Sequence, residues 1–422
     1  MKINLNTVGL YLVLLLIALI PFHQEISKLF VYYREILSLL FIVLLVMHGS
    51  SDIFQSMLNR RVFFEILLLV LFPLIIIVTA LVDPMVSLYG SDLSDSIMTR
   101  DADVNPKLYV FRNAVIYLPM VFYIAVRGLS PSDINKIAGV SALFAPLSVV
   151  TYMLGLGESS LVSHFEQLIS GYTKVEYNSY VPYLTFSVLS IIYLLELNYK
   201  KYKLLIKMSL MSLLVFVFAF IFYSTSRQAM LLAIIYIAVF MAKNISVSRL
   251  KNAVYYLIFF ITIYYSYEWI TLNYGENNSL TSKLLDESMH QTRIRIWVHG
   301  LSMLDASEFF TGAGLTSVLV SGPHNDYVRW VQKVGLIFAF ISFYPYFSAM
   351  FKSYIDVISY KKDRVNLYIL CASLFIIYHS MFGYPREDAY QAIWCFLGIS
   401  MWLGYHNYRR RKMLWRRINR IL

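Results

Sequence analysis

The chain has 422 residues and a formal net charge of +11, yet only 14% of its residues are charged and 59% are hydrophobic. A soluble globular protein carries roughly 25% charged and about 45–50% apolar residues, so the composition predicts an integral membrane protein. The basic residues lie in short segments between long apolar runs, which favours a role in membrane orientation and excludes a nucleic-acid-binding surface.

Apolar runs of about 20 residues, the length that a helix needs to cross a bilayer, recur along the whole chain. Backbone groups must be paired internally in lipid, so the expected fold is all-α, a polytopic bundle of about twelve transmembrane helices that forms one membrane domain over 1–422. The predicted spans run approximately over 7–22, 29–48, 62–82, 108–127, 134–154, 178–197, 203–222, 228–242, 252–271, 326–351, 366–383 and 388–407.

Lysine and arginine predict the orientation of the bundle. With the N-terminus placed in the cytoplasm, the inner segments contain 23 of the 36 basic residues, seven of them in 408–422. Since basic residues accumulate in cytoplasmic loops, both termini are expected in the cytoplasm, and 408–422 is expected to be a basic cytoplasmic tail.

The longest outer segment is 272–325, which we expect to be a large loop with short helices of its own. Apolar residues recur in it at helical spacing, namely Ile294, Trp297, Val298, Leu301 and Leu304. This pattern predicts an amphipathic helix that lies on the outer membrane face.

A helix start is expected where this loop meets the next span, because Pro323 suits the first helical position. This places His324 and Asn325 near unpaired backbone N–H groups at the positive end of the helix dipole. A titratable histidine there can serve an anion and a proton transfer. The alternative is an interfacial helix start, with His324 as a cap and with Arg329 and Lys333 reaching the interface.

Several arginines lie on the outer side, where orientation does not require them. These are Arg227, Arg293, Arg295, Arg329 and Arg386. A group of guanidinium side chains is suited to phosphate, because each one presents a planar fork of donors. The alternative for any single arginine is a contact with lipid headgroups or a surface ion pair.

The sequence does not favour a metal site. The acidic outer segment 83–107 contains Asp92, Asp95, Asp101 and Asp103, which can attract a divalent cation, but a solvated acidic loop is the better expectation. We therefore predict no metal site and no cofactor.

Four short motifs follow one another on the predicted outer side: S-x-S-R at a span start, R-x-x-x-W in the long loop, G-x-G, and H-N-x-Y-x(7)-G. The residues that match are Ser224, Ser226, Arg227, Arg293, Trp297, Gly312, Gly314, His324, Asn325, Tyr327 and Gly335. In this order the motifs resemble the O-antigen polymerase and O-antigen ligase superfamily over about the region 220–340. Lys333 departs from the pattern, since many relatives carry an acidic residue there.

The resemblance implies a metal-independent, inverting glycosyltransferase of the bacterial inner membrane, with its active site and the loop 272–325 on the periplasmic side. By that analogy Arg227 and Arg293 hold the diphosphate of the lipid-linked donor, and His324 takes the proton of the acceptor hydroxyl. Contacts to the substrates are expected from Asn325, Tyr327, Arg295, Arg329 and Arg386.

The implied partners are an undecaprenyl-diphosphate-linked oligosaccharide, an acceptor glycan lipid and the bilayer, and the resemblance admits a chain-length regulator. We favour a polymerase, which transfers the chain to another lipid-linked repeat unit. A ligase, which transfers it to the lipid A core, stays open because the motifs concern the donor. A flippase or transporter fits less well, because it predicts ionisable groups near the bilayer midplane, and a non-enzymatic scaffold also stays open.

Overall fold

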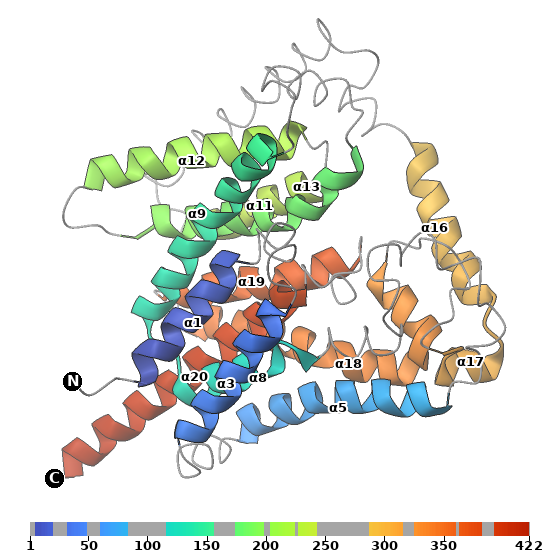
Figure 1. Cartoon of the computed structure of the whole chain (residues 1–422), viewed down its shortest axis with the longest axis horizontal. Helices are drawn as coiled ribbons and strands as arrows, with labels where there is room; N and C mark the ends of the chain where they lie inside the picture. Colours follow the sequence, from blue (N-terminus) through green and yellow to red (C-terminus); the bar gives the residue numbers. More distant parts are fainter. Residues whose placement is uncertain are drawn as a thin grey trace, which may run out of the picture.

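The computed structural model describes residues 5–19, 32–48, 60–82, 115–155, 174–197, 203–223, 227–242, 287–314, 325–359, 363–381 and 392–421. Over these residues the fold is all-helical and has no strand (Figure 1). The helices are α1 (Leu5–Leu19), α3 (Tyr33–His48), α5 (Arg60–Val82), α8 (Leu118–Arg127), α9 (Pro131–Gly155), α11 (Lys174–Leu195), α12 (Lys203–Tyr223), α13 (Arg227–Ala242), α16 (Glu287–Ser302), α17 (Ala306–Thr311), α18 (Asp326–Ser359), α19 (Arg364–Ser380) and α20 (Ala392–Ile421).

A helix lies at eleven of the twelve predicted spans, and the remaining range, 252–271, lies outside the described residues. Three described segments are long and apolar enough to cross a membrane: Val62–Thr79, Leu204–Ile221 and Asp326–Ser359. The all-helical fold with membrane-spanning capacity is thereby confirmed, whereas the number of twelve spans stays a prediction. The segment predicted as a basic tail continues α20 as a helix to Ile421.

Helix α11 packs on α9, α12, α13 and α19. Every residue from Tyr183 to Leu195 is buried, as expected for a helix that is apolar on all sides. The Tyr193 ring stacks on Tyr368 of α19 with 4.5 Å between ring centroids, and the hydroxyl of Ser190 hydrogen-bonds the Tyr368 hydroxyl at 2.9 Å. The α11–α19 contact therefore combines apolar burial with a few satisfied polar groups.

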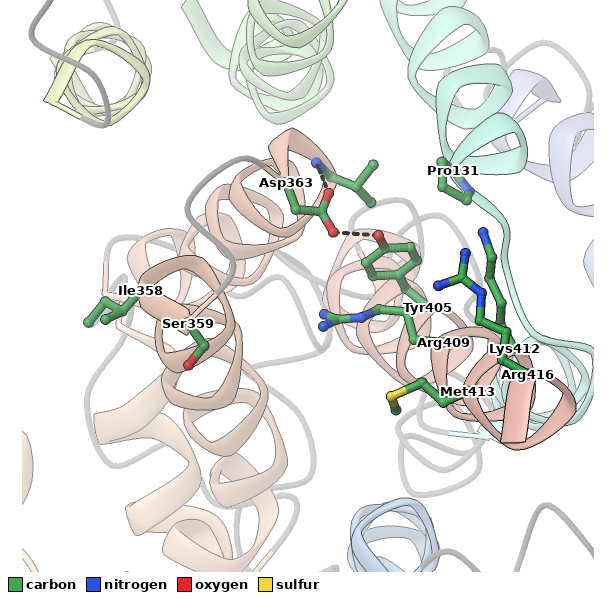
Figure 2. Close-up of a pocket in the computed structure, with 10 residues that line it drawn as sticks. Pro131, Ile358, Ser359, Asp363, Tyr405, Arg409, Lys412, Met413 and Arg416 are labelled. Atoms are coloured by element: carbon green, nitrogen blue, oxygen red, sulfur yellow. Dashed lines mark hydrogen bonds between the residues drawn. The ribbon is translucent and has the colours of Figure 1, made fainter. Parts of the chain in front are cut away.

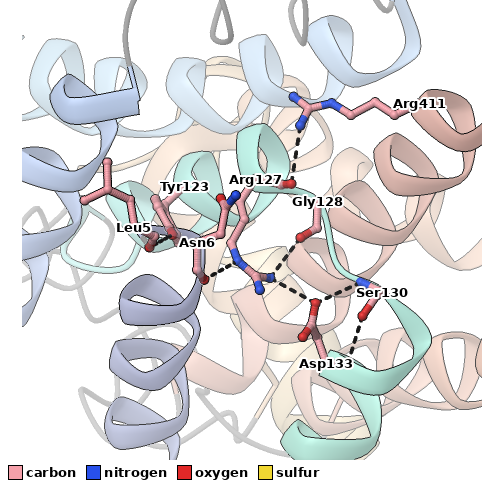
Figure 3. A network of polar contacts seen from close by, with 8 residues as sticks. All are labelled: Leu5, Asn6, Tyr123, Arg127, Gly128, Ser130, Asp133 and Arg411. Atoms are coloured by element: carbon pink, nitrogen blue, oxygen red, sulfur yellow. Dashed lines mark hydrogen bonds and ion pairs between the residues drawn. The ribbon is translucent and has the colours of Figure 1, made fainter. Parts of the chain in front are cut away.

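Both described ends of the chain lie at one end of the bundle (Figures 1 and 3). The Arg127 guanidinium donates from Nε to the carbonyl of Asn6 at 2.7 Å and forms an ion pair with Asp133 at 3.2 Å. Nη2 of Arg411 donates to the carbonyl of Val126 at 2.7 Å. These contacts join α1, α8, α9 and α20, and we call this side the terminus-bearing end.

Helix α18 is broken at Gly335, whose φ of 80° and ψ of 165° are not helical. We call 326–334 its first segment and 336–359 its second segment. The second segment is about 36 Å long at 1.5 Å per residue, which exceeds the roughly 30 Å core of a bilayer. Helices α18 and α19 pack on each other in opposite directions, so the first segment of α18 and the last turn of α19 lie away from the terminus-bearing end.

A buried charged pair ties α5 to α18. Glu65 is fully buried, accepts a hydrogen bond from the Ser348 hydroxyl at 2.6 Å and forms an ion pair with Lys352. The ammonium of Lys352 also lies 5.0 Å from the ring centroid of Trp402 on α20. Lys352 thus connects Glu65 of α5 with Trp402 of α20.

Candidate functional site

The first segment of α18 carries a stripe of buried polar side chains. We call Asn325, Asp326, Arg329, Gln332 and Lys333 the polar stripe, and none of them exposes more than 9% of its area. Asp326, Arg329 and Lys333 follow at intervals of three and four, so they share one helix face. Ionisable side chains inside a membrane bundle are costly and mark functional positions more often than inert ones.

Asn325 caps the first segment. Its Oδ1 accepts the backbone N–H of Val328 at 3.2 Å, and its carbonyl accepts the N–H of Arg329 at 3.0 Å. The described helix thus begins at Asp326. Asn325 caps it, a role that the sequence analysis had considered for His324. Pro323 and His324 lie outside the described residues, and the catalytic role of His324 stays a prediction.

The G-x-G motif contacts the other end of the first segment. The backbone N–H of Ala313 donates to the carbonyl of Gln332 at 2.7 Å, and the N–H of Gly314 donates to that of Lys333 at 3.2 Å. The break at Gly335 interrupts the helical ladder there, and the carbonyls at a helix end need partners from elsewhere. Residues 313 and 314 supply those partners from a different part of the chain.

Gly312 and Gly335 allow this close approach. Both have positive φ, 86° and 80°, which side chains rarely tolerate. A Cβ on Gly312 would lie 2.6 Å from the Cα of Val334, and a Cβ on Gly335 would overlap the carbonyl of Phe310. The glycines of two motifs therefore serve one backbone contact between α17 and α18.

Helix α16 joins the same region through Gln332, whose Nε2 donates to the carbonyl of Gly300 at 2.9 Å. The helix predicted in the long loop is present and runs over Glu287–Ser302. Ile294 and Val298 of the predicted apolar stripe are 56% and 62% exposed, whereas Trp297, Leu301 and Leu304 are half-buried, so only part of the stripe points away from the rest of the protein. Its contact with the membrane face stays a prediction.

Helix α17 begins with a capping box that orders the residues before the G-x-G motif. Oδ1 of Asp305 accepts the N–H of Glu308 at 2.7 Å, and the Glu308 carboxylate accepts the N–H of Asp305 at 3.1 Å. The hydrogen bond from Glu308, with a further one from the Ser307 hydroxyl, lowers the pKa of Asp305 from its ordinary value.

Tyr327 joins the first segment of α18 to α19. Its hydroxyl donates to the carbonyl of Ile377 at 3.0 Å, and its ring lies 4.3 Å from that of Phe343, centroid to centroid. These contacts give Tyr327 a packing role. Its assignment to substrate binding stays a prediction.

The predicted arginines are spread over several elements. Arg227 is the first residue of α13, which packs on α11 and α19, whereas Arg293 and Arg295 belong to α16, which packs on α18. Helices α13 and α16 therefore contact different members of the α18–α19 pair. Arg329 is buried in the polar stripe and Arg295 is exposed.

The structure describes only the backbone at Arg227 and Arg293, and Arg386 lies outside the described residues. It brings Asn325, Tyr327 and Arg329 onto one short segment, with α16 packed beside it. The functional assignments of all these residues stay predictions.

Sequence reasoning gave no role to Asp326, Gln332 or His379. His379 lies in the last turn of α19, is 4% exposed and lies against the ring of Phe375, tilted to it, with 4.3 Å between ring centroids. It is two residues from Ile377, the residue that binds Tyr327, so it lies at the same end of the bundle as the polar stripe. Ionisable or amide side chains within apolar runs were the signal that could have found these positions.

Among the described residues, no group of three or more His, Cys, Asp and Glu side chains is placed to hold a metal ion. The acidic segment 83–107 lies outside the described part of the chain.

Neither a family model nor a curated protein matches this chain.

Proposed function

We propose that the chain is a membrane glycosyltransferase that acts on an undecaprenyl-diphosphate-linked glycan at the periplasmic face of the bacterial inner membrane. The acceptor is another lipid-linked repeat unit, which makes the protein an O-antigen type polymerase. Both termini and the basic end of α20 lie in the cytoplasm in this proposal.

The observation that supports the proposal is the convergence of separate motifs on the first segment of α18. The G-x-G turn donates two backbone hydrogen bonds to it, α16 with the R-x-x-x-W motif contacts it through Gln332, and the H-N-x-Y-x(7)-G motif includes it. These contacts join three of the four motifs on neighbouring elements of the chain, whereas Arg227 of the S-x-S-R motif lies on α13.

The chemistry of the proposal is a single displacement. The acceptor hydroxyl oxygen attacks the anomeric carbon of the donor, the bond from that carbon to the diphosphate oxygen breaks, and undecaprenyl diphosphate leaves with the electron pair. His324 takes the hydroxyl proton, which suits an imidazole with a pKa near neutrality. Arg227 and Arg293 bind the diphosphate, on which negative charge builds, so no metal is required.

A flippase or transporter is the less favoured function. It would use ionisable groups near the bilayer midplane. The buried pair Glu65–Lys352 is the kind of feature that such a function predicts, but Glu65 lies in the second turn of α5 and Lys352 lies two turns from the end of α18. Both positions are close to helix ends, which fits a structural tie better than a transport site.

A deletion strain tests the proposed function. A polymerase deletion leaves lipid A core that carries one repeat unit, and this is the expected result. Lipid-linked polymer with bare core would identify a ligase. Loss of all exported glycan would identify a flippase, and unchanged surface glycan would refute a role in this process.

A further inference from the structure

A second site lies at the terminus-bearing end, far along the bundle from the polar stripe. A cavity of about 900 Å³ opens between the end of α18, the start of α19, the start of α9 and the last turns of α20 (Figure 2). Tyr405, Arg409, Lys412, Met413 and Arg416 line it from α20. Their spacing places them on one helix face, so a continuous side of α20 forms the wall of the cavity.

The cavity has a surplus of positive charge. Among the described residues that line it, Arg409, Lys412 and Arg416 face one carboxylate, that of Asp363. Both oxygens of that carboxylate are already used, because Oδ1 accepts the N–H of Val365 at 3.0 Å and Oδ2 accepts the Tyr405 hydroxyl at 2.5 Å.

Arg409 forms a long ion pair with Asp356 at 4.0 Å and extends toward the end of α18, whereas Lys412 and Arg416 extend toward Pro131 (Figure 2). These two are the cations best placed to meet an anion that enters the cavity.

The position of the cavity identifies the anion. Ile358 and Ser359 line it, and they are the last residues of a helix long and apolar enough to cross a membrane. The cavity therefore lies at the depth where a span ends, which is the level of the lipid headgroups. Leu414 and Trp415 on the neighbouring face of α20 are 46% and 66% exposed, and an exposed tryptophan beside basic residues is typical of a helix at that level.

From these observations we infer that the cavity binds the phosphate headgroup of an anionic phospholipid of the adjacent leaflet. Basic pockets between membrane helices recognise such headgroups through charge and several donors. The apolar side chains of Ile358 on α18 and Met413 on α20, on opposite sides of the cavity, fit the glycerol and first acyl carbons (Figure 2). This binding is independent of the proposed glycosyl transfer, because it uses none of the residues assigned to that reaction.

The test is a binding measurement on the purified full chain in a neutral detergent. Native mass spectrometry counts retained lipid, and the thermal midpoint is followed on titration with phosphatidylglycerol, cardiolipin, phosphatidylcholine or inorganic phosphate. The anionic lipids are expected to be retained and to raise the midpoint. Equal binding of phosphatidylcholine would overturn the proposal, and so would an equal effect of inorganic phosphate, which would indicate a free anion.

A charge-matched pair of variants locates the site. The variant K412Q/R416Q removes two cations from the cavity, and K136Q/R410Q removes two from the same end of the bundle outside it. A basic side chain near an anionic membrane surface contributes roughly a fivefold change in affinity, so the first variant should bind about 25-fold more weakly. The second variant should bind as the wild type does. Equal weakening in both would show diffuse attraction and would contradict the site.

A photoactivatable phosphatidylglycerol gives an independent readout on the unaltered protein. Cross-links are expected in peptides that contain 358–359 and 405–416, and cross-links confined to other peptides would overturn the assignment.

Discussion

Gly312, after α17, packs on the backbone of Lys333 and Val334, and Gly335, at the break of α18, packs on the backbone of Phe310 and Thr311, so that neither position has room for a Cβ. The contact lets residues 313 and 314 hydrogen-bond the carbonyls of Gln332 and Lys333. Two motifs that the sequence shows separately are therefore one structural unit. That unit holds α17 and the first segment of α18 together, directly after His324.

Substitution of either glycine should unfold this unit. Gly335→Ala combines a strained positive φ with overlap of the Phe310 carbonyl, and a loss of about 3 kcal/mol or more in the free energy of unfolding is expected. Gly139→Ala is the matched control, since a Cβ there meets nothing within 4 Å, and a gain of about 0.5–1 kcal/mol is expected in a helix. Thermal denaturation in detergent measures both. Equal stability of the two variants would contradict the proposed contact.

The pair Glu65–Lys352 should be energetically coupled. Glu65 is fully buried while the Lys352 side chain is 27% exposed, so Glu65→Gln is expected to cost about 2 kcal/mol rather than the larger loss of a fully buried pair. The double variant E65Q/K352M should cost less than the sum of the single variants. A double-mutant cycle measures this coupling, with Lys207→Met as the control lysine, and strict additivity would show that the pair contributes nothing.

The start of α17 should depend on pH. Hydrogen bonds from Glu308 and Ser307 lower the pKa of Asp305 in the folded state, so its contribution is present above the unfolded pKa and is lost as pH falls through the folded pKa. Amide protection of residues 306–309, measured by hydrogen exchange of the whole protein, should therefore decrease below about pH 4. Asp305→Ala should lower this protection at neutral pH and remove its pH dependence. Protection that is unchanged down to pH 3 would speak against the cap.

The catalytic assignments predict loss of product without loss of protein. His324→Ala and Arg293→Ala should abolish polymer. The first removes the proposed proton acceptor and the second removes a guanidinium that donates hydrogen bonds to the diphosphate, so each raises the barrier of the same step. His299→Ala, an exposed histidine on α16, is the control and should leave polymer unchanged. Surface glycan is compared by gel electrophoresis with protein abundance measured in parallel. Wild-type glycan from either catalytic variant would refute its role.

The orientation predicts opposite accessibility of the two ends of the bundle. In a chain whose native cysteines are replaced by alanine, Ser307→Cys on α17 should react with a membrane-impermeant maleimide from the periplasm. Asn419→Cys on α20, which lies outside the cavity lining, should react only after the inner membrane is opened. Both positions are exposed, so a failure to react is not due to burial. Labelling of both from the same side would rule out the predicted topology.

Much of the fold could be predicted from the sequence because helix formation in lipid depends on local properties. Apolar runs near the length of a bilayer placed a helix at eleven of twelve predicted ranges, and periodicity alone located α16 in the long loop. The candidate site was less accessible. Its motifs named Asn325 and Tyr327, but Asn325 is a helix cap and Tyr327 bonds the carbonyl of Ile377.

By itself, the sequence determined that the fold is all-helical, with helices able to cross a membrane, and where most of the described helices lie. These follow from composition and from periodicity within one segment. Only the tertiary structure decided that Gly312 packs on the backbone of Val334, that Arg329 and Lys333 are buried, and that Glu65 pairs with Lys352, 287 positions away. Such contacts depend on which helix faces are brought together, and no local pattern encodes the neighbour of a face.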